Sequence, residues 1–252
     1  MCTCAWWEVG VVSDLRTMLW KEVRELLAVR RSLVLFLVAV LVFGILPAVA
    51  LHGHHAASGR VLAPIINWFR LGYGLFATLF LGLQTAPDLV LHERIGRSLD
   101  YLLATRLPDW AIYGGKVLTS ALFAYLAGLL ALAVQLVVSA LMDNGRGWQW
   151  LYFGQADTRT MALRVMGGLA LYVSVLGTFV AFRVGDQRTA YMVSLVGVVV
   201  LILPLALNWI PVHFTAEWMG RAALVFDLFS VAVAFAGLLF FRRQMLVLYL
   251  QE

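Results

Sequence analysis

The feature that most constrains this chain is a series of long apolar stretches that follow one another with short polar breaks between them. A helix needs roughly 20 mostly apolar residues to cross the hydrocarbon of a bilayer, and the sequence supplies such stretches repeatedly. Hydrophobic residues make up 62% of the chain and charged residues 13%, whereas soluble domains contain roughly 45–50% apolar and about 25% charged residues. The sequence therefore predicts one all-α, polytopic membrane domain that occupies residues 1–252.

The apolar stretches predict six transmembrane helices. Their ranges are 33–51, 71–91, 117–142, 160–182, 191–207 and 222–241. With the N-terminus inside, most of the 19 lysine and arginine residues fall on the cytoplasmic side, as the positive-inside rule requires. We therefore expect both termini in the cytoplasm and the chain in the cell (inner) membrane. The same rule accounts for the net charge of +5, so no nucleic-acid partner is expected.

The segment 14–31, before the first span, has the pattern of an amphipathic helix. Its predicted apolar face consists of Leu15, Met18, Leu19, Val23, Leu26 and Leu27, and its predicted polar face of Arg16, Lys21, Glu22, Arg24 and Glu25. A helix with this length and a basic polar face suits the headgroup plane of a membrane, where Arg30 and Arg31 would anchor the first span to lipid. The alternative is a soluble cytosolic helix.

The break between the second and third spans is long enough to contain a helix of its own. Its apolar stripe consists of Ile95, Leu99, Leu102 and Leu103. Pro108 disfavours helix for the residue before it, and Asp109 can cap the helix that follows. The pattern predicts a short cytoplasmic amphipathic helix over residues 93–106, followed by a restart into the third span.

The segment 93–116 resembles the signature loop of type-2 ABC transporter permeases. The positions that match this family are Glu93, Arg94, Leu99, Asp100, Leu102, Leu103, Ala104, Thr105, Leu107, Ile112, Gly115 and Lys116. Three positions depart from the family pattern. Ser98 stands in for a threonine, Arg97 precedes it where the family has a glycine, and Arg106 replaces a proline.

The resemblance implies the membrane subunit of an ATP-driven exporter. Such a permease dimerises with a second copy or a related permease and binds a cytosolic ATP-binding-cassette ATPase, into which its coupling helix docks. The implied ATPase-contact residues are Glu93, Arg94, Arg97, Leu99, Asp100, Leu102, Leu103 and Arg106. The leucines would anchor the helix and the charged residues would set its orientation. The alternative is a helix that only lies on the membrane surface.

ATP hydrolysis is not expected on this chain. A phosphate-binding loop needs two glycines at fixed spacing followed by Lys and Ser or Thr, and the nearest approach, Gly115-Lys116, is followed by Val117. We therefore expect no cofactor and no enzymatic activity here, with ATP and Mg on the partner subunit. A second hypothesis replaces transport with a mechanical or anchoring role in an ABC-type assembly or motility complex. A membrane enzyme would need acid, base or metal ligands gathered at one depth, which the sequence does not indicate.

Two further sets of residues are candidates for chemistry. His52, His54 and His55 are expected in the first external loop, where they could bind a borderline cation or simply form an exposed cluster. Because no carboxylate or cysteine lies nearby in the sequence, no metal site is predicted. Asp88 and Asp227 fall within predicted spans, where ionisable groups are costly and often functional. For Asp227 the alternatives are a polar path and a structural ion pair, with Arg221 as the candidate partner.

Overall fold

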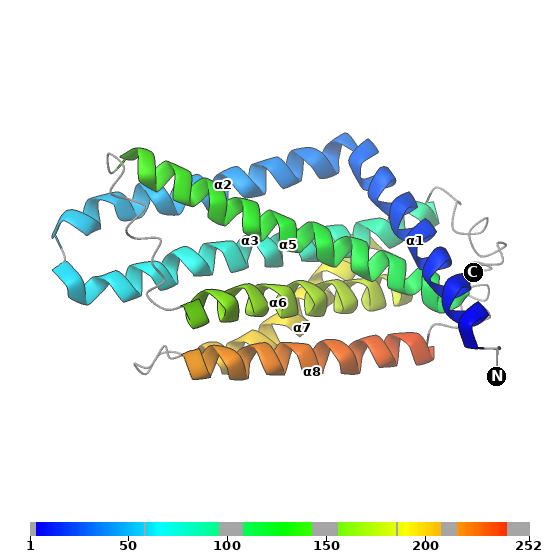
Figure 1. The fold of residues 1–252 in the computed structure, drawn as a ribbon. Helices are drawn as coiled ribbons and strands as arrows, with labels where there is room; N and C mark the ends of the chain where they lie inside the picture. The colour runs from blue at the N-terminus through cyan, green and yellow to red at the C-terminus, as the bar shows by residue number, and fades with distance from the viewer. Residues whose placement is uncertain are drawn as a thin grey trace.

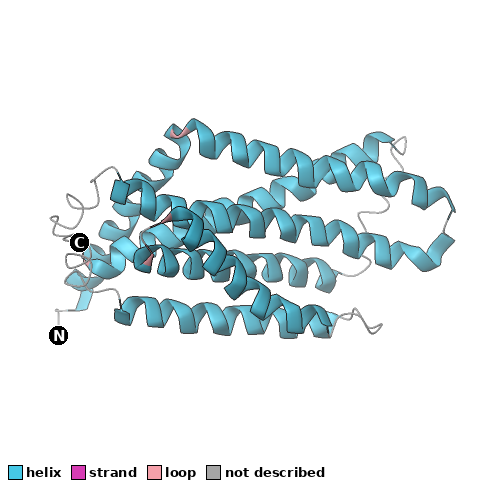
Figure 2. Ribbon diagram, turned by 180° about the vertical axis from the view of Figure 1, so that it is seen from behind, coloured by secondary structure: helices cyan, strands magenta, loops and turns pink. Residues whose placement is uncertain are grey.

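The computed structural model describes the backbone of residues 4–57, 59–95, 108–142, 156–184, 186–207 and 216–240. The described helices are α1 (Cys4–Ala28), α2 (Arg30–Ala57), α3 (Gly59–Ile95), α5 (Asp109–Met142), α6 (Ala156–Arg183), α7 (Gln187–Leu207) and α8 (Ala216–Phe240). No strand occurs in these ranges (Figure 2). The predicted all-α fold is therefore confirmed for this part of the chain, whereas residues 96–106 of the predicted coupling helix lie outside it.

The helices from α2 to α8 form an elongated bundle in which successive helices run in opposite directions (Figure 1). α1 crosses one end of this bundle, beside the beginning of α2, the end of α3 and the beginning of α5. We call this end of the molecule the α1 end. It gathers segments that are far apart in the sequence, and it contains the polar side chains analysed below.

Among the described residues, four helices are long and apolar enough to cross a bilayer. The qualifying stretches are Arg30–Ala50, Gly72–Glu93, Asp109–Met142 and Leu163–Arg183. Their length and apolar composition indicate a helical membrane protein. α7 and α8 contribute shorter apolar stretches of described residues, Gln187–Val200 and Leu224–Gly237, so the fifth and sixth predicted spans stay predictions.

The centre of the bundle is formed by α3 and α6, because 67% and 72% of the residues in an apolar 18-residue segment of each helix are buried, against 28% and 33% in the corresponding segments of α2 and α5. Small residues allow the helices to approach closely. At Gly128 of α5, a Cβ atom would collide with Thr78 of α3 and Met166 of α6. At Gly177 of α6, it would lie 2.8 Å from the Cβ of Ala86.

A sharp corner at Val29 joins α1 to α2 (Figure 1). The Val29 N–H donates to the carbonyl of Glu25 at 3.1 Å, and the Ser32 N–H donates to the carbonyl of Val29 at 3.1 Å. Helical hydrogen bonds thus continue on both sides of the corner. The predicted N-terminal helix ends earlier than expected, at Ala28, and the two arginines that follow belong to α2.

At the opposite end, two helices extend beyond the predicted spans. α2 continues to Ala57, so the backbone at His52, His54 and His55 is helical and does not form the expected external loop. α3 begins at Gly59, before the predicted span 71–91, and its apolar stretch is Gly72–Glu93. Alanine has a high helix propensity, and Ala56 and Ala57 favour continuation of α2. The side chains of the three histidines lie outside the described residues.

Candidate functional site

Five charged side chains from three helices meet at the α1 end, and we call them the α1 ion cluster. It consists of Lys21, Glu22 and Glu25 from α1, Glu93 from the end of α3 and Lys116 from the second turn of α5. α5 begins at Asp109, so Lys116 lies close to the start of this helix at the α1 end. The Pro108 carbonyl begins the helical hydrogen bonds by accepting from the N–H groups of Ala111 and Ile112.

Lys116 is the centre of the cluster and is fully buried. Its Nζ donates hydrogen bonds to Glu22 Oε1 at 3.0 Å and to the Leu89 carbonyl at 3.0 Å. The same Nζ lies 2.6 Å from Glu93 Oε2. A charge can be held away from water only when it is paired and hydrogen-bonded, and these three oxygens provide such an environment. Lys116 therefore links α5 to both α1 and α3.

Lys21 closes the outer side of the cluster. Its Nζ pairs with Glu93, lies 3.2 Å from Glu25 Oε1 and lies 3.6 Å from Glu22 Oε1. Burial lowers the pKa of Lys21, but the hydrogen bond to Glu93 and the neighbouring carboxylates outweigh burial and raise the pKa overall. Burial has the largest effect on Glu22 and raises its pKa; Lys116 opposes this rise and Glu93 adds to it.

The sequence pattern placed Glu22 on the polar face of the N-terminal helix, and this placement is wrong. Glu22 is fully buried, and it lies in one stripe with Met18 and Leu26, which are 1% and 4% exposed. Met18 and Leu26 lie four residues before and after Glu22, and this spacing could have revealed that all three side chains share the buried face of α1. The cation that makes burial of Glu22 tolerable, Lys116, is 94 residues away in the sequence.

Glu93 is also turned inward. It was expected to contribute to an ATPase-contact surface, but its side chain is 3% exposed and pairs with Lys116 and Lys21. Among the predicted contact residues, it alone has a described side chain; Arg94, Arg97, Leu99, Asp100, Leu102, Leu103 and Arg106 lie outside the described side chains. Glu93 thus anchors the end of α3 at the first position of the segment that carries the resemblance.

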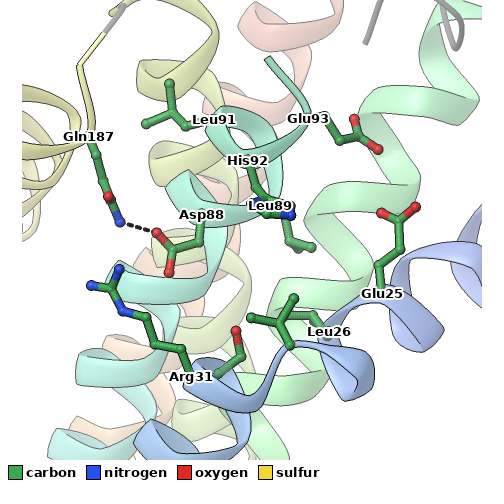
Figure 3. A pocket seen from close by; sticks show the side chains of 11 residues that line it. Glu25, Leu26, Arg31, Asp88, Leu89, Leu91, His92, Glu93 and Gln187 are labelled. Carbon is green, nitrogen blue, oxygen red and sulfur yellow. Dashed lines mark hydrogen bonds between the residues drawn. The ribbon is translucent and has the colours of Figure 1, made fainter. Parts of the chain in front are cut away.

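A pocket of about 230 Å³ lies next to the α1 ion cluster, between α1, α2, α3 and the start of α7 (Figure 3). Asp88 of α3 lies inside it and accepts a hydrogen bond from Nε2 of Gln187. Arg31 and His92 act on Asp88 electrostatically. The predicted intramembrane residue Asp88 is therefore part of a polar pocket at one end of the helices.

Asp227 lies elsewhere. Its Oδ2 is 3.3 Å from Nη2 of Arg164, which joins α8 to α6. The two side chains are 38% and 56% exposed, so this is a surface ion pair. The structure thus gives Asp227 a structural partner, and the ion pair that it describes is with Arg164, whereas the sequence had suggested Arg221.

The α1 ion cluster is better suited to holding helices than to chemistry. Carboxylate oxygens of Glu22, Glu25 and Glu93 lie within 4.8 Å of one another, as they would around a metal ion. Two ammonium groups already occupy the space between these carboxylates and compensate their charge. A metal would have to displace a hydrogen-bonded lysine. The arrangement is therefore an ionic link between α1, α3 and α5.

Comparison with protein-family models and with curated proteins finds no match to this chain.

Proposed function

We propose that this chain is the permease subunit of an ATP-binding-cassette exporter of the type-2 class, energised by an ATPase on a separate polypeptide. The observation that carries the proposal is the sequence pattern of residues 93–116, which runs from the end of α3 into the beginning of α5. The helical membrane bundle and a crossing helix before the first span are compatible with it. The transported substrate is not specified by any feature of the spans.

The proposal includes six spans with both termini in the cytoplasm, and a dimer with a second copy or a related permease. α7 and α8 would provide the fifth and sixth spans. They contain 21 and 25 residues, and at 1.5 Å of rise per residue either is long enough for a hydrocarbon core of about 30 Å. This topology places the α1 end on the cytoplasmic side.

The α1 ion cluster supports a role for the segment between α3 and α5 in energy coupling. Glu93 lies in the last turn of α3, at the first position of the predicted coupling helix, and Lys116 lies in α5, and both pair with residues of α1. A force on the coupling helix would therefore act on the two helices that flank it and, through the ion pairs, on α1. The cluster would make these elements move as one unit when the ATPase closes on ATP.

The test is co-purification. The tagged protein is extracted in mild detergent with its membrane partners, and the captured material is identified by mass spectrometry and assayed for ATP hydrolysis. The expected result is recovery of a soluble ATP-binding-cassette subunit that is lost in a Leu99→Asp, Leu102→Asp variant. Charge reversal of Arg94 and Arg97 should weaken the same complex.

A matched control is Arg188→Glu, an exposed arginine at the start of α7 that carries the same charge change outside the loop. It should leave the complex intact. Repeated recovery without any ATPase would refute the permease proposal. An ATPase whose activity responds only to a further protein, and never to transported compounds in vesicles, would favour the mechanical role.

A further inference from the structure

The pocket beside the α1 ion cluster is lined by an arginine side chain whose N–H groups are available to a ligand within the described part of the chain. Arg31 lines this pocket from the first turn of α2. Within the described part of the chain, its guanidinium has no hydrogen bond and no ion pair, and its interaction with Asp88 is electrostatic and at longer range. A guanidinium presents five N–H donors in a planar fork that matches the oxygens of a phosphate group.

Asp88 gives the same pocket an acceptor. One of its oxygens accepts the hydrogen bond from Gln187, and the carboxylate lies between Gln187 and Arg31 (Figure 3). The other two carboxylates that line the pocket, Glu25 and Glu93, are already paired with Lys21. Asp88 is therefore the acidic group best placed to bind an additional cation. A guanidinium and a carboxylate in one pocket select a ligand with a phosphate and an amine.

The position of the pocket favours a lipid as the source of these groups. Arg31 and Ser32 stand at the start of the apolar stretch of α2, whereas Asp88 stands near the end of that of α3. The pocket thus lies where apolar helices end, at the level expected for headgroups. Beyond it, α2 exposes Val34, Leu37, Val38 and Leu41, against which acyl chains can pack. The volume of the pocket is about 230 Å³, which is room for roughly eight water-sized groups of about 30 Å³ each. A phosphate group with a short amine arm has this size.

We propose that this pocket binds the head of an aminophospholipid, with the phosphate on Arg31 and the primary ammonium on Asp88. The site is independent of an ATPase partner and of transport. It differs from general contact with lipid because it requires both charges of the headgroup in fixed positions.

The first experiment uses the unmutated full chain in detergent, so no variant has to fold. Native mass spectrometry measures binding of phosphatidylethanolamine, phosphatidylcholine and phosphatidylglycerol with identical acyl chains. Phosphatidylethanolamine should bind about tenfold more tightly than phosphatidylcholine, because a trimethylated nitrogen cannot donate the charge-assisted hydrogen bond to Asp88. Equal binding of the three lipids, or preference for phosphatidylglycerol, would overturn the proposal.

Variants then separate the two contacts. Arg31→Gln should weaken binding of both nitrogen-containing lipids by about tenfold, because it removes the phosphate contact. Asp88→Asn should abolish the preference for phosphatidylethanolamine and leave the affinity for phosphatidylcholine unchanged. Arg30→Gln is the matched control, since the exposed Arg30 carries the same charge one residue away and does not line the pocket. Retention of the preference in Asp88→Asn, or an equal effect of Arg30→Gln, would contradict the assignment.

Free phosphoethanolamine distinguishes a lipid from a soluble ligand with the same polar groups. Added at the concentration of the lipid, it should not displace bound phosphatidylethanolamine, because it cannot gain the packing of acyl chains on α2. Full displacement would show that the pocket takes a soluble phosphate and would overturn the assignment to lipid.

Discussion

Replacement of Lys116 by methionine tests whether the α1 ion cluster holds the α1 end together. Methionine is unbranched and adapts to irregular gaps, so the substitution mainly removes the ammonium group. Glu22 and Glu93 would remain buried, 0% and 3% exposed, with the partly exposed Lys21 as the cation left beside them. Removing one partner of a buried ion pair costs about 3–5 kcal/mol. We expect the free energy of unfolding of Lys116→Met to fall by this amount.

The measurement is equilibrium unfolding of the purified chain in mixed micelles with increasing denaturing detergent, followed by circular dichroism. Lys21→Met is the comparison, because Lys21 is 35% exposed and its ion pairs are screened by solvent. Its loss should cost about 1 kcal/mol or less. The triple variant Lys116→Met, Glu22→Gln, Glu93→Gln should recover much of the stability, since neutral groups tolerate burial better than unpaired charges. An unchanged stability of Lys116→Met, or a triple variant less stable than Lys116→Met alone, would refute the reasoning.

Three further outcomes are expected, each read from thermal unfolding in detergent. Gly128→Ala should lower the free energy of unfolding by about 1–3 kcal/mol through overpacking. Gly72→Ala should leave it unchanged, because a Cβ at Gly72 meets nothing within 4 Å. Equal melting temperatures of the two variants would contradict the close packing at Gly128. Asp186 caps α7 through hydrogen bonds to the N–H and hydroxyl groups of residue 189, which lower its pKa below the ordinary 3.8. The advantage of the wild type over Asp186→Ala should therefore be full at neutral pH and shrink as pH falls below 3.8, and a constant difference would disprove the cap. Exchange of the charges at Arg164 and Asp227 should change stability by less than about 1 kcal/mol, and a larger loss would show that the pair is more than a surface contact.

The helices were predictable because long apolar stretches allow few alternatives. The start of α5 at Asp109 agrees with the predicted cap after Pro108, whereas the start of α7 was predicted less well than its apolar centre, since a polar turn extends this helix beyond its apolar stretch. For α7, the additional turn begins at Gln187, just after the cap at Asp186. Local capping chemistry decides such boundaries, and hydropathy alone does not register it.

The α1 ion cluster could not be predicted from local patterns. Glu22 and Lys116 look like ordinary surface residues at the edge of apolar segments, and only the crossing of α1 over α5 brings them together. The position of Asp88 within a span was predicted, but its hydrogen bond with Gln187 and its electrostatic interaction with Arg31 depend on α7 and α2. Pairing across 99 residues of sequence is a property of the packed bundle.

The corner at Val29 has a mechanical consequence. No proline or glycine loosens it, and hydrogen bonds continue from Glu25 through Val29 to Leu33. Helical hydrogen bonds therefore tie α1 and α2 to each other at the corner. A displacement of α1 would be transmitted to the start of α2, and so to the tilt of the apolar helix that begins there.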